Sequence, residues 1–121
     1  MITMIVFIRR KKGMSREEFS RYYLEHHAPL VKSTPEFMRH VRKYAQYHPA
    51  PGSAEAGSLF GDITDYDAVG EIWFDSRESM NEALSEPVYL KNVKPDEYRF
   101  IDIDACLSFV GGEHILHDEM K

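Results

Sequence analysis

The sequence predicts an α+β domain in which a four-stranded antiparallel sheet carries two helices on one face. Three observations predict it. The chain has 121 residues, enough for one core. Its composition, 43% apolar and 29% charged, is that of an ordinary globular protein and excludes disorder along the whole chain. Its apolar patterns follow the order strand, helix, strand, strand, helix, strand, which gives a domain over residues 1–115 and a tail over residues 116–121.

The first two predicted elements are a strand over residues 2–9 and a helix that begins at Ser15. The strand is apolar on both sides, as expected of a strand covered on both faces. Ser15 and Glu18 have the spacing of a capping box. One helix stripe contains Phe19, Tyr23, His26 and Leu30, with His27 at its edge. Because Pro29 lacks an N–H, the helix is expected to kink or end near His27 and Ala28.

From residue 38 onward, the sequence predicts two strands, a helix and a final strand. The strands cover residues 38–48 and 66–74, and the final strand covers residues 101–110. A loop rich in Pro, Gly and Ala fills residues 49–65 and is long enough to act as a lid. The second helix is capped at residues 75–78 and has Met80, Ala83 and Leu84 on its buried side, and Pro87 ends it.

One face of the predicted sheet is not covered by helices, and this bare face indicates which partners to expect. Val69, Glu71 and Trp73 would make it a broad, partly apolar surface, which a second copy of the chain would cover. We therefore expect a homodimer. The net charge of −5 argues against nucleic acid as a partner. The apolar runs are too short to cross a membrane and the start lacks a signal-peptide pattern, so the expected location is the cytoplasm.

Three segments in order resemble the EthD-like family. They are Met14-Ser15-x-x-Glu18-Phe19-x-x-Tyr22-Tyr23-x-x-x-His27-Ala28-Pro29-Leu30, Tyr66-Asp67-Ala68-Val69-Gly70-Glu71-Ile72-Trp73-Phe74-Asp75-Ser76 and Asp96-Glu97-x-x-Phe100-Ile101-Asp102. The resemblance covers residues 1–115. It implies ferredoxin-like subunits that form a dimeric α+β barrel, with a pocket between the sheet and the helices.

The resemblance also implies candidate residues for chemistry. His26 matches a histidine implicated in a methylisomerase of this fold, and His27 matches the histidine of the wider family signature. Tyr44 falls at a pocket tyrosine of that isomerase. Ile72 falls where the isomerase has a reactive cysteine, so this chain is not expected to repeat that reaction.

Together these residues predict a cofactor-independent small-molecule enzyme of catabolism or secondary metabolism. His26 or His27 would be the catalytic acid or base, because histidine exchanges protons near neutral pH. The predicted pocket residues are Phe19, Tyr23, Leu30, Tyr44, Ile72 and Phe74. The substrate would be an apolar cyclic or ether compound. Isomerisation or elimination after proton abstraction is the favoured reaction, and oxygenation by an oxidoreductase is second.

Two alternatives remain open at this stage. The first is a non-catalytic protein that binds a hydrophobic small molecule or serves as an accessory subunit. In such a carrier both ring nitrogens of the histidine could be bound to backbone, whereas a catalytic imidazole keeps one nitrogen free in the pocket. The second is a metal site at His114 and His117, which is disfavoured because it lies in the terminal segment. No metal, haem or nucleotide cofactor is expected, since no motif for one is present.

Overall fold

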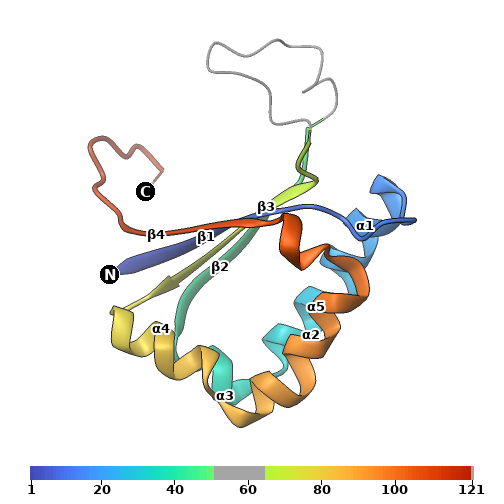
Figure 1. The fold of residues 1–121 in the computed structure, drawn as a ribbon. Coiled ribbons are helices and arrows are strands. Elements are labelled where there is room, and N and C mark those ends of the chain that lie inside the picture. Colours follow the sequence, from blue (N-terminus) through green and yellow to red (C-terminus); the bar gives the residue numbers. More distant parts are fainter. Residues whose placement is uncertain (51–64, 121) are drawn as a thin grey trace.

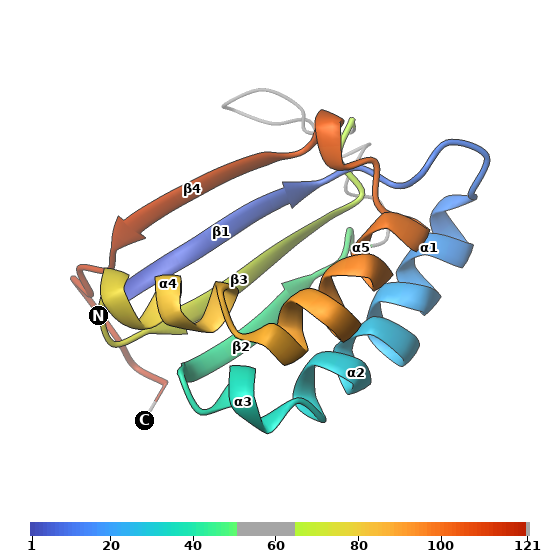
Figure 2. The ribbon, with the colours of Figure 1, turned by 60° about the horizontal axis from the view of Figure 1, so that its bottom comes forward.

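The described helices lie on one face of a four-stranded antiparallel sheet (Figures 1 and 2). This computed structural model describes residues 1–50 and 65–120. The strands are β1 (Ile2–Ile8), β2 (Val41–Tyr47), β3 (Ala68–Phe74) and β4 (Leu107–Gly112), in the order β2-β3-β1-β4. The predicted α+β class is confirmed. The predicted loop over 49–65, with its role as a lid, lies almost wholly outside the described residues.

The first helix, α1 (Arg16–Tyr22), begins as predicted. Ser15 Oγ accepts a hydrogen bond from the Glu18 backbone N–H at 3.1 Å, and Glu18 Oε1 accepts one from the Ser15 N–H at 3.1 Å. These two bonds complete the capping box.

The helix does not end near His27, since the helical chain continues through Pro29, but the regular α-helix is interrupted there. A π-helical turn, η1 (Tyr23–His27), follows α1, and α2 (Ala28–Lys32) follows η1. The Ala28 N–H donates to the Tyr23 carbonyl, five residues back. A wider turn changes the α-helical register in which the Pro29 ring would meet the carbonyl four residues before it. The turn therefore lets the helix continue.

The wider turn also changes which side chains face the sheet. Phe19, Tyr23, His27 and Val31 are all buried, at regular intervals of four residues. In an unbroken α-helix the stripe predicted from the sequence would instead run through His26 and Leu30. His26 has 57% of its side chain exposed. The π turn therefore selects His27 as the inward histidine of the adjacent pair.

The chain from Leu30 to β2 contains a short helix that the sequence did not predict. This helix, α3 (Pro35–Met38), occupies the residues just before β2. The predicted strand over 38–48 therefore begins three residues late, at Val41. Phe37 of α3 is buried in the core beneath the sheet and packs on Tyr89, with ring centroids 5.1 Å apart.

The second half of the chain is more helical than predicted. After α4 (Arg77–Leu84), which Ser76 caps, come η2 (Tyr89–Val93), α5 (Lys94–Phe100) and η3 (Ile103–Ala105). The final strand predicted over 101–110 is wrong at its start, since β4 begins at Leu107. The start of that segment contains η3, and Ile101 and Cys106 pack against the core cluster that includes Phe19 and Phe100. The helical start at Lys94-Pro95-Asp96-Glu97 has a clear signal, a proline followed by acidic residues.

Among the described residues, no helix is long and apolar enough to cross a membrane. The face of the sheet opposite the helices carries exposed apolar side chains. Tyr47, Leu107 and Phe109 are 50%, 57% and 61% exposed, respectively.

Candidate active site

A cavity of about 360 Å³ lies between the sheet and the helices. Most of its wall is apolar. The polar or ionisable side chains that line it are His27, Tyr44, Tyr89, Lys94, Glu97, Cys106 and Ser108. A large apolar space with few polar groups is the usual form of a small-molecule site.

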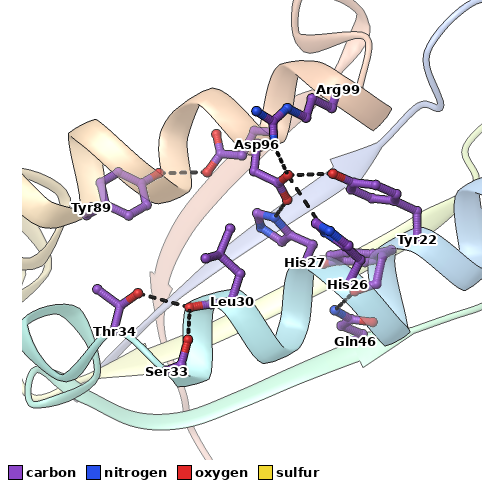
Figure 3. A network of polar contacts seen from close by, with 12 residues as sticks. Tyr22, His26, His27, Leu30, Ser33, Thr34, Gln46, Tyr89, Asp96 and Arg99 are labelled. Atoms are coloured by element: carbon purple, nitrogen blue, oxygen red, sulfur yellow. Dashed lines mark hydrogen bonds and ion pairs between the residues drawn. The ribbon is translucent and has the colours of Figure 1, made fainter.

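His27 is held in this wall by a carboxylate from a distant helix. Its Nδ1 atom lies 2.8 Å from Oδ2 of Asp96, which projects from α5 (Figure 3). Only 7% of the His27 side chain and none of the Asp96 side chain is exposed. A carboxylate can only accept a hydrogen bond, so Nδ1 of His27 carries the hydrogen. The contact therefore fixes both the orientation of the ring and which nitrogen is protonated.

The other nitrogen of His27, Nε2, has no hydrogen-bond partner among residues 1–50 and 65–120. Because Nδ1 donates to Asp96, the neutral ring has its lone pair on Nε2. His27 also lines the cavity. The ring is therefore arranged as a base oriented by a carboxylate, the pairing that activates histidine in acid–base catalysis.

Asp96 gathers three further groups around its carboxylate (Figure 3). The Tyr22 hydroxyl donates to Oδ1 at 2.5 Å, and Arg99 Nη1 donates to Oδ1 at 3.3 Å. His26 Nδ1 lies farther away, 3.8 Å from the same oxygen. Burial acts to raise the pKa of Asp96, but hydrogen bonds from Tyr22 and His27 outweigh it, so the pKa lies below its ordinary value. Asp96 is therefore ionised at neutral pH.

His26 occupies a different position. Its ring stacks on Tyr22, with centroids 4.4 Å apart, and it is not part of the cavity wall. The two adjacent histidines thus share one carboxylate while facing different surroundings.

A second polar group lies in the cavity wall, on η2 and α5. The Tyr89 hydroxyl donates to Oε2 of Glu97 at 2.7 Å, and Lys94 Nζ donates to Oε1 of Glu97 at 3.1 Å. Burial is the main cause that raises the pKa of Tyr89, followed by the negative charge of Glu97. The Tyr89 hydroxyl therefore stays protonated and donates its hydrogen bond to Glu97.

The structure brings only some of the predicted site residues to the cavity. His27, Tyr44 and Ile72 line it. Phe19 and Phe74 are fully buried in the core, outside this wall.

Tyr23 and Leu30 also lie outside the cavity wall. Tyr23 is buried with its hydroxyl against Gly70, and an ideal Cβ on that glycine would lie 2.5 Å from the Tyr23 oxygen. Leu30 packs at the edge of the core, and its carbonyl accepts from the hydroxyls of Ser33 and Thr34 (Figure 3). The periodicity of the sequence indicates which side chains face inward. It does not indicate which of those side chains pack in the core and which line the cavity.

Sequence reasoning missed Asp96, Glu97 and Tyr89. The available signal was the pair of acidic residues after Pro95, which indicates a helix start but not which element its side chains face. Cys106 also lines the cavity, where burial raises the pKa of its thiol and keeps it protonated. Across residues 1–50 and 65–120, no group of three His, Cys, Asp or Glu side chains is placed to hold a metal ion.

Comparison with known proteins finds relatives of this chain that are named as enzymes. A 106-residue stretch is 28% identical to the conidial pigment biosynthesis dehydratase EthD of Metarhizium robertsii, and it covers 84% of this chain and 75% of that protein. A decarboxylase of Claviceps purpurea is 25% identical over 108 residues, with 84% and 75% covered.

Solved structures share the fold. An ethyl tert-butyl ether D (EthD) family protein of Bacillus halodurans matches with a TM-score of 0.67 and 20% identity, over 94% of this chain and 99% of that one. A protein of Thermobifida fusca, described as a dimeric ferredoxin-like protein, matches with a TM-score of 0.60 and 12% identity, over 93% and 90%. The family model for the EthD domain matches residues 11–104. The chain therefore belongs to the EthD domain family.

Proposed function

We propose that this protein is a lyase that acts on a small, largely apolar molecule, with His27 as the general base. The observation that carries the proposal is the His27–Asp96 contact at the wall of the cavity, which leaves Nε2 of the ring free. In this arrangement Asp96 orients the ring and stabilises the imidazolium that forms when His27 takes a proton.

The relatives support a lyase rather than the other reactions that the sequence left open. Two of them are named dehydratases and two are named decarboxylases, and one of the dehydratases serves conidial pigment biosynthesis. None of these names describes an isomerase or an oxidoreductase. Dehydration and decarboxylation both need a bond to carbon to break and a proton to move. The residues in the cavity can move that proton without further groups.

The free Nε2 atom of His27 also distinguishes a catalytic protein from one that only binds a small molecule. A carrier needs only an apolar wall, and both ring nitrogens of a histidine there can be used up by structural bonds. His27 makes one such bond, to a buried and ionised carboxylate. This favours the enzyme over the non-catalytic alternative.

We further propose that two copies associate through the open face of the sheet. That face exposes Tyr47, Leu107 and Phe109, and apolar patches of this kind are typical of interfaces. Structural neighbours described as dimeric support the same assembly. The cytoplasmic location and the division into a domain over 1–115 and a tail over 116–121 stay predictions.

The experiment measures proton abstraction from a carbon acid directly. The probe is 2-tetralone, a bicyclic ketone with acidic protons beside its carbonyl, and deuterium uptake from D₂O is followed by NMR. The protein should accelerate uptake over buffer. His27→Gln should lower the accelerated rate by about 10² or more, the usual share of a general base.

His26→Gln is the matched control, because His26 neighbours the same carboxylate but lies outside the cavity. We expect it to keep nearly the wild-type rate. A wild-type protein that does not accelerate exchange, or a His27→Gln variant that exchanges as fast as the wild type, would overturn the proposal.

A further inference from the structure

Gln46 uses every hydrogen-bonding group of its side-chain amide beside the cavity. On β2, its Nε2 atom donates to the Tyr23 carbonyl at 3.0 Å and to the Tyr44 hydroxyl at 3.2 Å. Its Oε1 atom lies 2.9 Å from Nε2 of His48. This chain of contacts runs along one strand and ends at a hydroxyl in the cavity wall.

The Tyr23 carbonyl fixes which end of the Gln46 amide is nitrogen. A backbone carbonyl can only accept a hydrogen bond, so the atom facing it must be the NH₂ group. Oε1 must then accept from His48, whose Nε2 carries a hydrogen. Burial lowers the pKa of His48, which favours the neutral ring. The contact with Oε1 of Gln46 then places the hydrogen of that ring on Nε2.

The same logic fixes the direction of the Tyr44 hydroxyl. An amide N–H can only donate, so the Tyr44 oxygen accepts from Gln46 and its own hydrogen is left over. Among the residues that the structure describes, no group accepts that hydrogen. Burial raises the pKa of Tyr44, so the hydroxyl stays protonated. A half-buried donor without an acceptor therefore lines the same cavity as His27.

We propose that Gln46 is a positioning residue that leaves the Tyr44 O–H free to donate to a carbonyl oxygen of the substrate. This inference rests on the proposed function and names its substrate class. The substrate is a ketone that carries a hydroxyl on its β carbon or a carboxylate on its α carbon. In both reactions an electron pair moves toward the carbonyl, from the α C–H bond in dehydration and from the bond to the carboxylate in decarboxylation. One donor would then serve dehydration and decarboxylation alike.

For a β-hydroxy ketone the step balances with these two residues. Nε2 of His27 takes the proton from the α carbon, and the electrons of that C–H bond form an enolate whose oxygen accepts from Tyr44. The enolate then reforms the carbonyl while the β C–O bond breaks. The imidazolium of His27 returns its proton to the departing hydroxide, which leaves as water. The product is an α,β-unsaturated ketone, and no electron is gained or lost overall.

The test measures binding of an enolate analogue and needs no turnover. The probe is 2-naphthol, whose ionised form has the shape and charge of the enolate of 2-tetralone, and its ionisation is followed by absorbance. Naphthalene, which lacks the oxygen, measures binding to the apolar wall alone. We expect the wild-type protein to lower the pKa of bound 2-naphthol relative to that of 2-naphthol in water.

Three variants test the role of Tyr44 and its support from Gln46. Tyr44→Phe removes the donor, and Gln46→Glu supplies an acceptor that draws the Tyr44 hydrogen away from the cavity. Each should weaken binding of the ionised probe about tenfold or more, the scale of a hydrogen bond to a charged group, and leave naphthalene binding unchanged. Tyr47→Phe is the matched control, since Tyr47 lies on the same strand but is 50% exposed on the open face.

A double-mutant cycle separates positioning from general damage to the fold. Gln46→Met should weaken binding of the ionised probe in the wild-type background but not in the Tyr44→Phe background, if Gln46 acts through Tyr44. Equal losses in both backgrounds would overturn the proposal. So would unchanged binding of ionised 2-naphthol to Tyr44→Phe. Failure of the His27 base shows instead in the exchange assay with His27→Gln, so the two failures are distinguishable.

Discussion

Nδ1 of His27 lies 2.8 Å from Oδ2 of Asp96, and this contact joins the π-helical turn η1 to helix α5 across 69 residues of sequence. The same carboxylate accepts from the hydroxyl of Tyr22, the last residue of α1 and the one just before η1. One buried anion therefore holds both the site and the packing of two helices. The contact has consequences for stability that can be measured without a substrate.

The stability contributed by Asp96 should depend on pH in the acid range. The folded pKa of Asp96 is lowered, below an unfolded value of about 3.9. Its contribution is therefore fully present above the unfolded pKa and is lost as the pH falls through the folded pKa. We expect the difference in free energy of unfolding between the wild type and Asp96→Asn to shrink between about pH 6 and about pH 3. Urea unfolding at each pH measures it. If this difference in free energy of unfolding does not change with pH, the ionisation of Asp96 does not contribute to stability.

Removing the hydrogen bond from Tyr22 should destabilise the ionised form of Asp96. Tyr22→Phe deletes a hydrogen bond to Oδ1 of Asp96 and keeps the ring, so we expect a loss of about 1–2 kcal/mol at neutral pH. Because this bond lowers the pKa of Asp96, its loss should also move the acid unfolding transition to higher pH. Tyr98→Phe on the exposed side of α5 is the control. An unchanged acid transition in Tyr22→Phe would contradict the assignment.

The close approach of Tyr23 to β3 predicts a second effect on stability. A Cβ at Gly70 would lie 2.5 Å from the Tyr23 oxygen. Gly70→Ala should therefore cost about 1–3 kcal/mol through overpacking. Tyr23→Phe removes the clashing atom, so it should recover part of that loss in the double variant, as measured by thermal unfolding. If the two losses simply add, the clash is not the cause.

The π-helical turn leads to a prediction about the stability of a variant in which Leu24 is deleted. Leu24 is 57% exposed in η1, and its removal would restore an α-helical register while keeping His27 and Val31 on the inner stripe. Pro29 would then meet the carbonyl four residues before it, and the deletion should cost about 3 kcal/mol or more. Combining the deletion with Pro29→Ala should recover much of this loss in chemical unfolding. No recovery would mean that Pro29 is not what the turn accommodates.

The sequence predicted the sheet, the first helix cap and the family, because these depend on local patterns. Alternating residues define strands, and a Ser–Glu spacing defines a cap. Two features could not be read in this way. The π turn is a shift of one residue in an otherwise regular helix, so the inward histidine could not be chosen between His26 and His27. Helix α5 was not predicted because Tyr98 and Phe100, the aromatic residues of its seven-residue sequence, are two positions apart and show no helical period.

The site itself was predictable only in part. The sequence pointed to a histidine, from the helix pattern and the family resemblance, and to Tyr44 and Ile72 from the resemblance. His27, Tyr44 and Ile72 line the cavity. Asp96 was not predicted as the partner of His27, because that pairing depends on how α5 packs against η1. Contacts between elements far apart in the chain leave no periodic signal in a single sequence.

The tautomer of His27 decides whether the ring can act as the base, and long-range ¹H–¹⁵N spectra of protein labelled at histidine report it. The His27→Gln variant assigns its signals. We predict that the neutral ring carries its hydrogen on Nδ1, and that the Nε2 signal alone shifts strongly when 2-naphthol is added. A neutral ring with its hydrogen on Nε2, or an Nε2 signal that ignores the probe, would contradict it.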